Sequence, residues 1–383
     1  MKEVIPMGIY KKFILLIALL IAGMTFMACE SENTVLALNP YEDVDFETAD
    51  QALTNLHTHT KNSDGNGTPH DVVDYYEGYG YDTLALTDHD TVTYPWTFST
   101  LNDGEDGWED RDPDALGMLA VEGNELTVPR NEWFPDTVSL FTDYEYQQPE
   151  SLEGTPEAFH NTLDEIDEIE DSLAFIAHPG REWKTHTDYA DQDMYSIPWW
   201  VDLFNDHPKD QLIGLEVFNR NDQYRHDRGL WDEILLKTMP ERPVWGLGND
   251  DYHGDGEGYI HRSFTRQLIE GDFTEDALRE SLRSGHFFTS NVNNSDDDAP
   301  RISNIIVDEE ARTITIEGSG YDTIEWFHGS NEFYEPTRIA EGETFEYGSF
   351  EGNYVRARLI KDKEGADEGK TLTQPFGFTQ END

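Results

Sequence analysis

The sequence predicts an α/β protein with a small all-β module near its C-terminal end. Two observations support this prediction. From Ala52 to about Val292, short apolar runs alternate with amphipathic helical segments, an order that favours a parallel sheet with helical crossovers. Polar residues of metal-ligand type follow several of the apolar runs. This pattern favours a barrel whose site lies at the carboxyl ends of its strands.

The first β-α-β unit shows the pattern clearly. Ala52, Leu53 and Leu56 form an apolar run suited to a buried strand. Thr68-Pro69 begins a helix with apolar residues at helical spacing, and residues 81–87 form the next predicted strand. Further strands are expected at 118–121, 137–141, 173–177, 212–218 and 244–247, and helices at 156–170, 198–205, 227–239 and 274–284.

A change of composition after Val292 indicates a domain boundary. Residues 293–298 are polar and lack apolar periodicity, as in a linker or an exposed loop. Short strand candidates follow at 302–307, 313–317, 323–327, 345–347 and 354–360, separated by turn residues. We therefore assign residues 51–292 to the α/β domain and 299–380 to a sandwich-like β module.

The chain is strongly acidic, with a formal net charge of −54 from 80 acidic and 26 basic residues among 383. The charge is spread along the sequence, so its self-repulsion would be relieved by salt. This favours a halophilic, salt-adapted protein over an ordinary acidic secreted one. Nucleic acid is not expected as a stable partner, because its backbone carries the same sign of charge.

The N-terminal residues resemble a bacterial lipoprotein signal. Lys11 and Lys12 precede an apolar stretch from Phe13 to Phe26, and Met27-Ala28 leads to Cys29, which is the only cysteine in the chain. We expect a signal peptide at 1–28, lipidation of Cys29 and an acidic tether at 29–50 with little structure. The protein would then be extracytoplasmic and anchored to a membrane. An uncleaved anchor is the alternative, but about 14 apolar residues fall short of the ~20 of a spanning helix.

Three predicted strand ends carry metal-ligand types. His57 and His59 lie two residues apart, so on an extended strand they point to the same face and can bind one metal ion. His89 follows a second apolar strand. Asp251 and His253 follow a third.

Further candidates lie between these strand ends. Glu125 is preferred to Glu122 as a carboxylate that bridges two cations, and His178 comes directly after an apolar strand. Glu216 stands within a strand-like run, where a carboxylate is costly unless it is paired or ligating, and its role is left open. A mixed set of imidazoles and carboxylates suits manganese, iron or zinc.

These residues, taken in order, resemble the motifs of the PHP (polymerase and histidinol phosphatase) metallohydrolases. The matching segments are His57-Thr58-His59 with Ser63-Asp64-Gly65, Thr87-Asp88-His89-Asp90, Gly123 to Thr127, Ala177-His178-Pro179 and Asp251 to His253. The lipoprotein signal, Gly214 to Asn219 and Ser284 to Phe288 look most like the secreted CehA/McbA-like branch. The resemblance covers roughly residues 53 to 290.

The resemblance implies a distorted (β/α)7 barrel that holds two or three divalent metal ions. One ion would be held by His57, His59, Glu125 and Asp251, a second by Glu125 and His178, and a third by His89 and His253, with Asp64 nearby. Many members have another histidine after the bridging glutamate, whereas residues 124 to 155 contain none. Asp136 can replace it, or the second site is weakened.

The expected function is hydrolysis of small external phosphoesters, with a metal-bound hydroxide as the nucleophile. His253, His89 or Asp64 would protonate the leaving group, and Arg181 would clamp a phosphoryl oxygen unless it is simply a surface arginine. Two alternatives remain. One is an amidohydrolase-like enzyme, or an ester or carbamate hydrolase on the same scaffold, and the other is a non-catalytic surface-binding lipoprotein.

Overall fold

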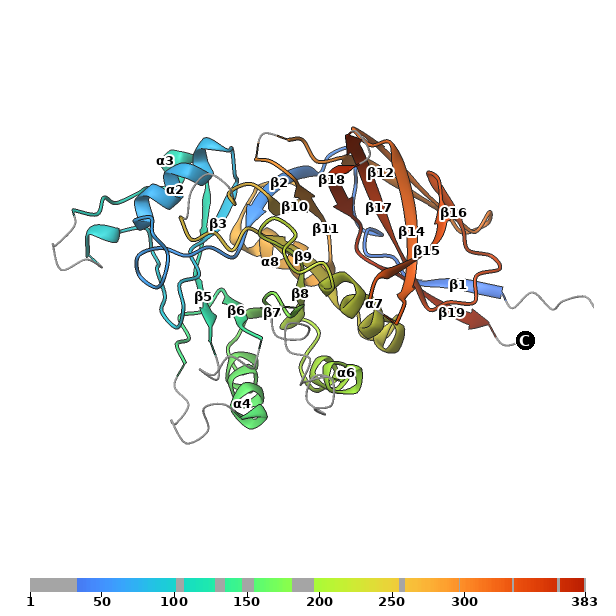
Figure 1. Ribbon diagram of the computed structural model, residues 1–383, viewed down its shortest axis with the longest axis horizontal. Coiled ribbons are helices and arrows are strands. Elements are labelled where there is room, and N and C mark those ends of the chain that lie inside the picture. The colour runs from blue at the N-terminus through green and yellow to red at the C-terminus, as the bar shows by residue number, and fades with distance from the viewer. Residues whose placement is uncertain are drawn as a thin grey trace, which may run out of the picture.

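The computed structural model describes residues 33–100, 107–127, 135–146, 155–180, 196–254, 259–295, 297–332, 334–363 and 366–381. Within them the fold is mixed α/β (Figure 1). The helices are α2 (Pro69–Gly78), α3 (Pro113–Leu116), α4 (Pro156–Asp167), α6 (Ile197–Asp206), α7 (Asp227–Thr238) and α8 (Glu275–Ser284), with a short 3-10 turn at Phe98–Thr100. The predicted helices all appear within a few residues of their expected bounds.

The strands of the first domain lie in two sheets. They are β2 (Asp50–Asn55), β3 (Thr83–Ala85), β4 (Leu119–Val121), β5 (Gly123–Leu126), β6 (Thr137–Leu140), β7 (Leu173–Ile176), β8 (Leu212–Asn219), β9 (Trp245–Asn249), β10 (Ser263–Ile269) and β11 (Phe287–Val292). One sheet has the order β5-β6-β7-β8-β9, whereas β2, β3 and β4 belong to the other. Among the described residues the strands therefore do not form a closed seven-stranded barrel.

The expectation of a parallel sheet is correct only in part. The pairs β2–β3, β3–β4, β7–β8 and β8–β9 are parallel, but β5–β6, β6–β7, β2–β10 and β10–β11 are antiparallel. Only nine described residues lie between β9 and β10, at 250–254 and 259–262, and none of them is helical, so the described residues give no crossover helix of the βαβ kind between these two strands. The alternation of apolar runs and helical segments in the sequence did not distinguish parallel from antiparallel connections.

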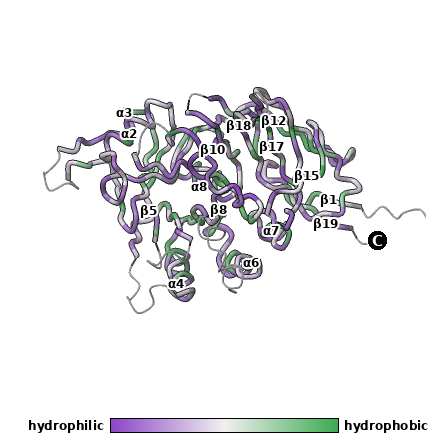
Figure 2. The backbone as a smooth tube through the Cα atoms, in the orientation of Figure 1, coloured by the Kyte–Doolittle hydropathy of each residue, from purple (hydrophilic) through white to green (hydrophobic). Residues whose placement is uncertain are grey.

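The helices form where capping residues and apolar periodicity coincide. Thr68 caps α2 in a reciprocal capping box with Asp71, and Val72, Val73 and Tyr76 are buried on its inner face. Helix α4 is capped by Thr155 and buries Ala158, Phe159, Leu163 and Ile166 in a cluster with residues of α6 and α7. Figure 2 shows hydrophobic and hydrophilic residues alternating along α4, as expected of a helix with one packed face.

The C-terminal strands are β12 (Arg301–Asp308), β13 (Thr313–Ser319), β14 (Thr323–Ser330), β15 (Pro336–Glu341), β16 (Thr344–Glu346), β17 (Tyr354–Lys363), β18 (Ala366–Leu372) and β19 (Phe376–Glu381). A three-stranded sheet, β12-β13-β16, shares a core with β14, β17 and β19, so the module is sandwich-like. Strand β18 also pairs with β11, and one sheet of eleven strands therefore continues from the first domain into the module.

The predicted tether at 29–50 is wrong for its described part. Strand β1 (Asn33–Leu38) pairs with β19 at the other end of the chain, as the blue and red arrows in Figure 1 show. Tyr41 is buried, and its hydroxyl donates to the Phe287 carbonyl oxygen and accepts from the Gln374 backbone N–H. Leu36 of β1 packs against the core of the β module, a contact that the acidic composition of the segment concealed.

Residues 1–32, with the predicted signal peptide and Cys29, lie outside the described residues. Among the helices that the structure describes, none is long and apolar enough to cross a membrane.

Candidate metal centre

Two loops that follow parallel strands are joined at the centre of the site. His57 and His59 come after β2 and Asp251 comes after β9. The His59 N–H donates to the Tyr252 carbonyl oxygen (2.8 Å), and the Asp251 N–H donates to the His57 carbonyl oxygen (3.0 Å). Both imidazoles are fully buried. The backbone therefore fixes the histidine pair and the aspartate relative to each other.

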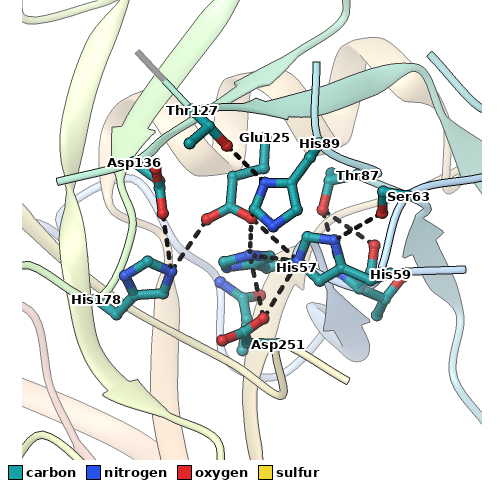
Figure 3. A network of polar contacts seen from close by, with 12 residues as sticks. His57, His59, Ser63, Thr87, His89, Glu125, Thr127, Asp136, His178 and Asp251 are labelled. Atoms are coloured by element: carbon teal, nitrogen blue, oxygen red, sulfur yellow. Dashed lines mark hydrogen bonds and ion pairs between the residues drawn. The ribbon is translucent and has the colours of Figure 1, made fainter. Parts of the chain in front are cut away.

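Glu125, from β5, lies among four imidazoles (Figure 3). Its Oε2 atom is 3.1 Å from His57 Nε2, 3.0 Å from His59 Nε2 and 3.2 Å from His89 Nδ1, and its Oε1 atom is 3.0 Å from His178 Nε2. Burial by itself would raise the pKa of Glu125, but the surrounding imidazoles, with His57 first, hold it well below its usual range. The group is therefore a buried carboxylate ion.

The geometry around Glu125 fits a cation better than a hydrogen-bond network. Although three ring nitrogens lie within 3.2 Å, Oε2 makes no hydrogen bond of acceptable geometry to any described residue. A buried charged oxygen without a hydrogen bond is costly. A metal ion at the point on which these donor atoms converge would satisfy both the oxygen and the ring nitrogens.

His57, His59 and Asp251 form one group of possible ligands. The two Nε2 atoms are 3.1 Å apart, and Asp251 Oδ1 is 3.5 Å from His57 Nε2 and 3.2 Å from His59 Nε2. Burial lowers the pKa of His59, but the carboxylates of Asp251 and Glu125 close to its Nε2 atom raise it to about 10. The carboxylates therefore favour a positive charge at this point.

A second and more exposed group contains Asp64, His89 and His253. Asp64 Oδ1 is 3.2 Å from His253 Nε2, and Asp64 Oδ2 is 3.7 Å from His89 Nε2. The hydrogen bond from His253 lowers the pKa of Asp64 to about 2, although burial opposes the shift. The side chain of Asp64 is 56% exposed, so this group lies at the mouth of the site.

The donor atoms therefore form three groups, each with atoms within 4.8 Å of one another: His57, His59 and Asp251; His57, Glu125 and His178; and His59, Asp64, His89 and His253. The sets implied by the family resemblance are brought together, with His59 reaching the third group as well. Asp136 Oδ2 is 3.8 Å from His178 Nε2, where it can supplement the second group. Glu122 is in none of the groups.

Glu216, whose role the sequence left open, holds two ligands in place. Its Oε1 atom is 3.0 Å from His57 Nδ1, and its Oε2 atom accepts from the His178 backbone N–H at 2.9 Å. Asn219 and Asn249 donate to the same carboxylate. A carboxylate on the far nitrogen of an imidazole orients the ring toward a metal, so Glu216 positions His57.

Asp88 and Asp250, which also belong to ligand-like sequence motifs, have structural roles. Asp88 accepts hydrogen bonds from Thr60, Ser63 and Thr93, which shapes the loop after β2. Asp250 accepts from the Tyr76 hydroxyl and from three consecutive backbone N–H groups that begin at His261. Neither carboxylate is in one of the three donor groups.

A cavity of about 660 Å³ opens beside the three groups. Its lining residues are Asp64, Asn66, His89, Asp90, Glu125, Thr127, Asp136, His178, Arg220, Tyr224, Asp251 and His253. Arg220 is the one arginine or lysine in this lining, as far as the described residues go. Arg181, the predicted phosphoryl clamp, lies outside the described residues.

Arg220 was missed at the sequence level. It follows β8 directly and has a left-handed backbone conformation (φ 51°). Its Nε atom donates to Asp251 Oδ2 at 3.1 Å, and its Nη2 atom is 2.8 Å from His253 Nδ1. The strand-end rule that found the histidines could have found Arg220 too, since it stands one residue beyond Asn219.

Comparisons with known proteins give distant structural likenesses. No family model and no curated protein matches the sequence. A two-domain protein from Bacteroides vulgatus that contains a predicted PHP-like metal-dependent phosphoesterase is 17% identical over 89% of this chain and 98% of its own, with a TM-score of 0.45. A proposed metal-dependent phosphoesterase from Bifidobacterium adolescentis is 18% identical over 61% and 96%, with a TM-score of 0.37. Endonuclease Q, in complex with a 27-mer duplex that carries an abasic lesion, is 17% identical over 61% and 56%, with a TM-score of 0.38.

Proposed function

We propose that the protein is a metal-dependent hydrolase of the PHP type that cleaves small phosphoesters. The observation that carries this proposal is the buried, ionised Glu125 with four imidazole nitrogens around it and a carboxylate oxygen that makes no hydrogen bond. The donors are nitrogen and oxygen with no sulfur, which suits manganese, iron or zinc.

The residues divide into ligands and supporting groups. His57, His59, Glu125 and Asp251 would hold one cation, Glu125 and His178 a second, and His89, His253 and Asp64 a third. Cations bound here would polarise a phosphoryl oxygen and lower the pKa of a water molecule. Glu216 holds the His57 ring and the His178 backbone in position. The imidazoles of His57 and His178 are buried, which keeps water away from the inner ligands.

Two groups of the cavity can act on the substrate itself. Arg220 presents a planar guanidinium between Asp251 and His253, where it can bind a phosphoryl oxygen by a forked contact. His253 and His89 border the cavity and can protonate a leaving oxygen when their ring nitrogens are not saturated as ligands. Asp64 is a poor acid in the metal-free protein, because a pKa of about 2 leaves it ionised at neutral pH.

The size and charge of the site favour a small substrate. The cavity of about 660 Å³ suits a compact ligand, and the lining carries five carboxylates against one guanidinium. Together with the net charge of −54, this disfavours a nucleic-acid polyanion, whose binding needs clustered lysine and arginine. We further propose, from the sequence of residues 1–29, that the enzyme is exported and anchored through Cys29.

A substrate panel tests the proposal. Purified protein loaded with Mn²⁺, Fe²⁺ or Zn²⁺ would be assayed against phosphomonoesters, phosphodiesters, carboxylic esters and carbamates, with and without a chelator. We expect chelator-sensitive release of phosphate or alcohol from at least one phosphoester. Hydrolysis of esters or carbamates alone would favour the alternative hydrolase, and binding without any turnover would favour a binding lipoprotein.

The role of Arg220 gives a sharper test on the same panel. Arg220→Lys keeps the charge but loses the fork, so kcat/KM for the phosphoester should fall roughly 10-fold to 100-fold, mostly through KM. Arg225→Lys is the matched control, because Arg225 is five residues away and its side chain is 77% exposed. Equal kinetics of the two variants would exclude Arg220 as the phosphoryl contact.

A further inference from the structure

A second cluster of possible ligands lies away from the metal centre, between α4 and α6. These helices are neighbours at the bottom of Figure 1. Helix α4 carries His160, Asp164 and Asp167 at positions i, i+4 and i+7, which lie on one face. His207 follows the last residue of α6 directly. Four residues with metal-binding side chains therefore meet where both helices end.

The His207 imidazole is the centre of this cluster. Its Nδ1 atom is 2.7 Å from Asp167 Oδ2 and 3.8 Å from Asp164 Oδ1, and its Nε2 atom is 3.4 Å from His160 Nδ1. One donor atom from each of Asp164, Asp167 and His207 lies within 4.8 Å of the others. The side chains are 68%, 16% and 1% exposed in that order, so the cluster reaches from the interior to solvent.

The electrostatics of the two helix ends favour a cation at this place. Carbonyl groups give a helix C-terminus partial negative charge, which basic side chains usually complement. Neither α4 nor α6 has a basic residue in its last turn, and α4 has Asp164 and Asp167 there instead. The nearby Arg242 donates its hydrogen bonds to the carbonyl oxygens of residues 204, 212 and 243. These N–H groups of Arg242 therefore bind backbone carbonyl oxygens and not the carboxylates of Asp164 and Asp167.

We propose that Asp164, Asp167 and His207 Nδ1 bind one divalent metal ion of the zinc and manganese class, separate from the catalytic centre. The ion binds Nδ1 of the neutral imidazole in the tautomer that carries its proton on Nε2, and water completes the coordination of the ion. The Nε2–H group of His207 donates to His160 Nδ1, the kind of outer hydrogen bond that orients metal-binding histidines.

Such an ion would have a structural role. Helices α4 and α6 stand on either side of β7 in the chain, and β7 leads to His178 of the catalytic centre. An ion that joins the two helix ends would therefore stabilise the α-β-α unit that carries this ligand, without contact to the substrate.

The test compares two variants with the same change of charge. Asp164→Asn removes a ligand that is largely exposed, so folding should be unaffected, and Glu168→Gln changes an exposed acid at the same helix end. Each protein would be loaded with Zn²⁺ and freed of excess ion, and bound zinc would be counted by mass spectrometry. Asp164→Asn should lose about one equivalent of zinc, through at least ~10-fold weaker binding at this site, whereas Glu168→Gln should match the wild type.

Two further measurements complete the test. Crystals soaked in Zn²⁺ should show an anomalous peak between Asp164, Asp167 and His207, and phosphoester turnover by the metal-loaded Asp164→Asn variant should equal that of the wild type. Equal zinc content in the two variants, or no peak at this position, would mean that the cluster is an ion pair only and would overturn the proposal. Failure of the proposed hydrolase activity would leave the zinc count unaffected.

Discussion

Replacing Glu125 by glutamine tests the organisation of the metal centre most directly. The substitution keeps size and shape but removes the negative charge that four imidazoles share, at distances of 3.0 to 3.2 Å. The amide nitrogen of glutamine also cannot ligate a cation. Because Glu125 contacts His57 and His59 through one oxygen and His178 through the other, both inner cations would lose a ligand.

The expected loss is at least ~100-fold in kcat/KM, which corresponds to about 2.7 kcal/mol of transition-state stabilisation. Steady-state kinetics of the metal-loaded variant would measure it, together with the number of bound metal ions per chain. Glu122→Gln is the matched control, since Glu122 is three residues away, half-buried and outside the three donor groups. A Glu125→Gln variant with more than about a tenth of wild-type activity, or a larger effect of Glu122→Gln, would refute the assignment of the bridging carboxylate.

Three other predictions concern the whole protein. Chelation should abolish turnover and molar salt should raise the midpoint of unfolding, because cations offset the carboxylates in both cases; a chelated protein with full activity would exclude metal dependence. Burial lowers the pKa of His261 to about 4, so the folded state favours the neutral imidazole. The contribution of this neutral side chain to stability is therefore complete above pH 6.5 and is lost as the pH falls toward 4. This contribution is at most about 3 kcal/mol, and denaturant unfolding of His261→Asn should show a flatter pH profile over that range than the wild type, whereas identical profiles would contradict it. Cys29→Ser should release the protein from membranes or leave an unprocessed precursor, and cell fractionation would detect either; wild-type protein that is soluble and unlipidated would contradict lipidation.

The ligand residues could be predicted from sequence because their signal is local. Except for Glu125, which lies within β5, each follows a short apolar strand. The carboxyl ends of parallel strands gather on one side of a sheet whatever the order of the strands. His57, His59, His178 and Asp251 therefore meet, although the predicted closed barrel does not form among the described strands. The prediction depended on the ends of strands and not on their pairing.

The supporting residues could not be predicted in the same way. Glu216 has its role because His57 and the His178 backbone lie beside it, and this proximity depends on the register of β7, β8 and β9. Sequence showed only that a carboxylate within a strand needs a partner. The same register brings Arg220, which follows β8, to the cavity that His178, which follows β7, also lines.

The extent of the sheet also could not be predicted from the sequence pattern. Composition suggested a boundary at 293–298, yet β11 pairs with β18 across it. The acidic residues before Ala52 suggested a tether, yet β1 is a strand of the C-terminal module. Pairing between strands far apart in the chain leaves no local signal, because each strand needs only the period-2 pattern that many segments share.

The pairing of β1 with β19 has a consequence for the order of folding. Thr34 and Gln380, whose side chains are hydrogen-bonded, stand 346 positions apart in the chain. On the ribosome β1 therefore emerges before the other described strands, and its partner strand emerges only after nearly all of the other described residues have been made. Contacts of such long range close slowly and leave edges exposed in the meantime. We therefore expect the sheet to be completed only after β19 has been made, and such a delay would suit the export that we propose from residues 1–29.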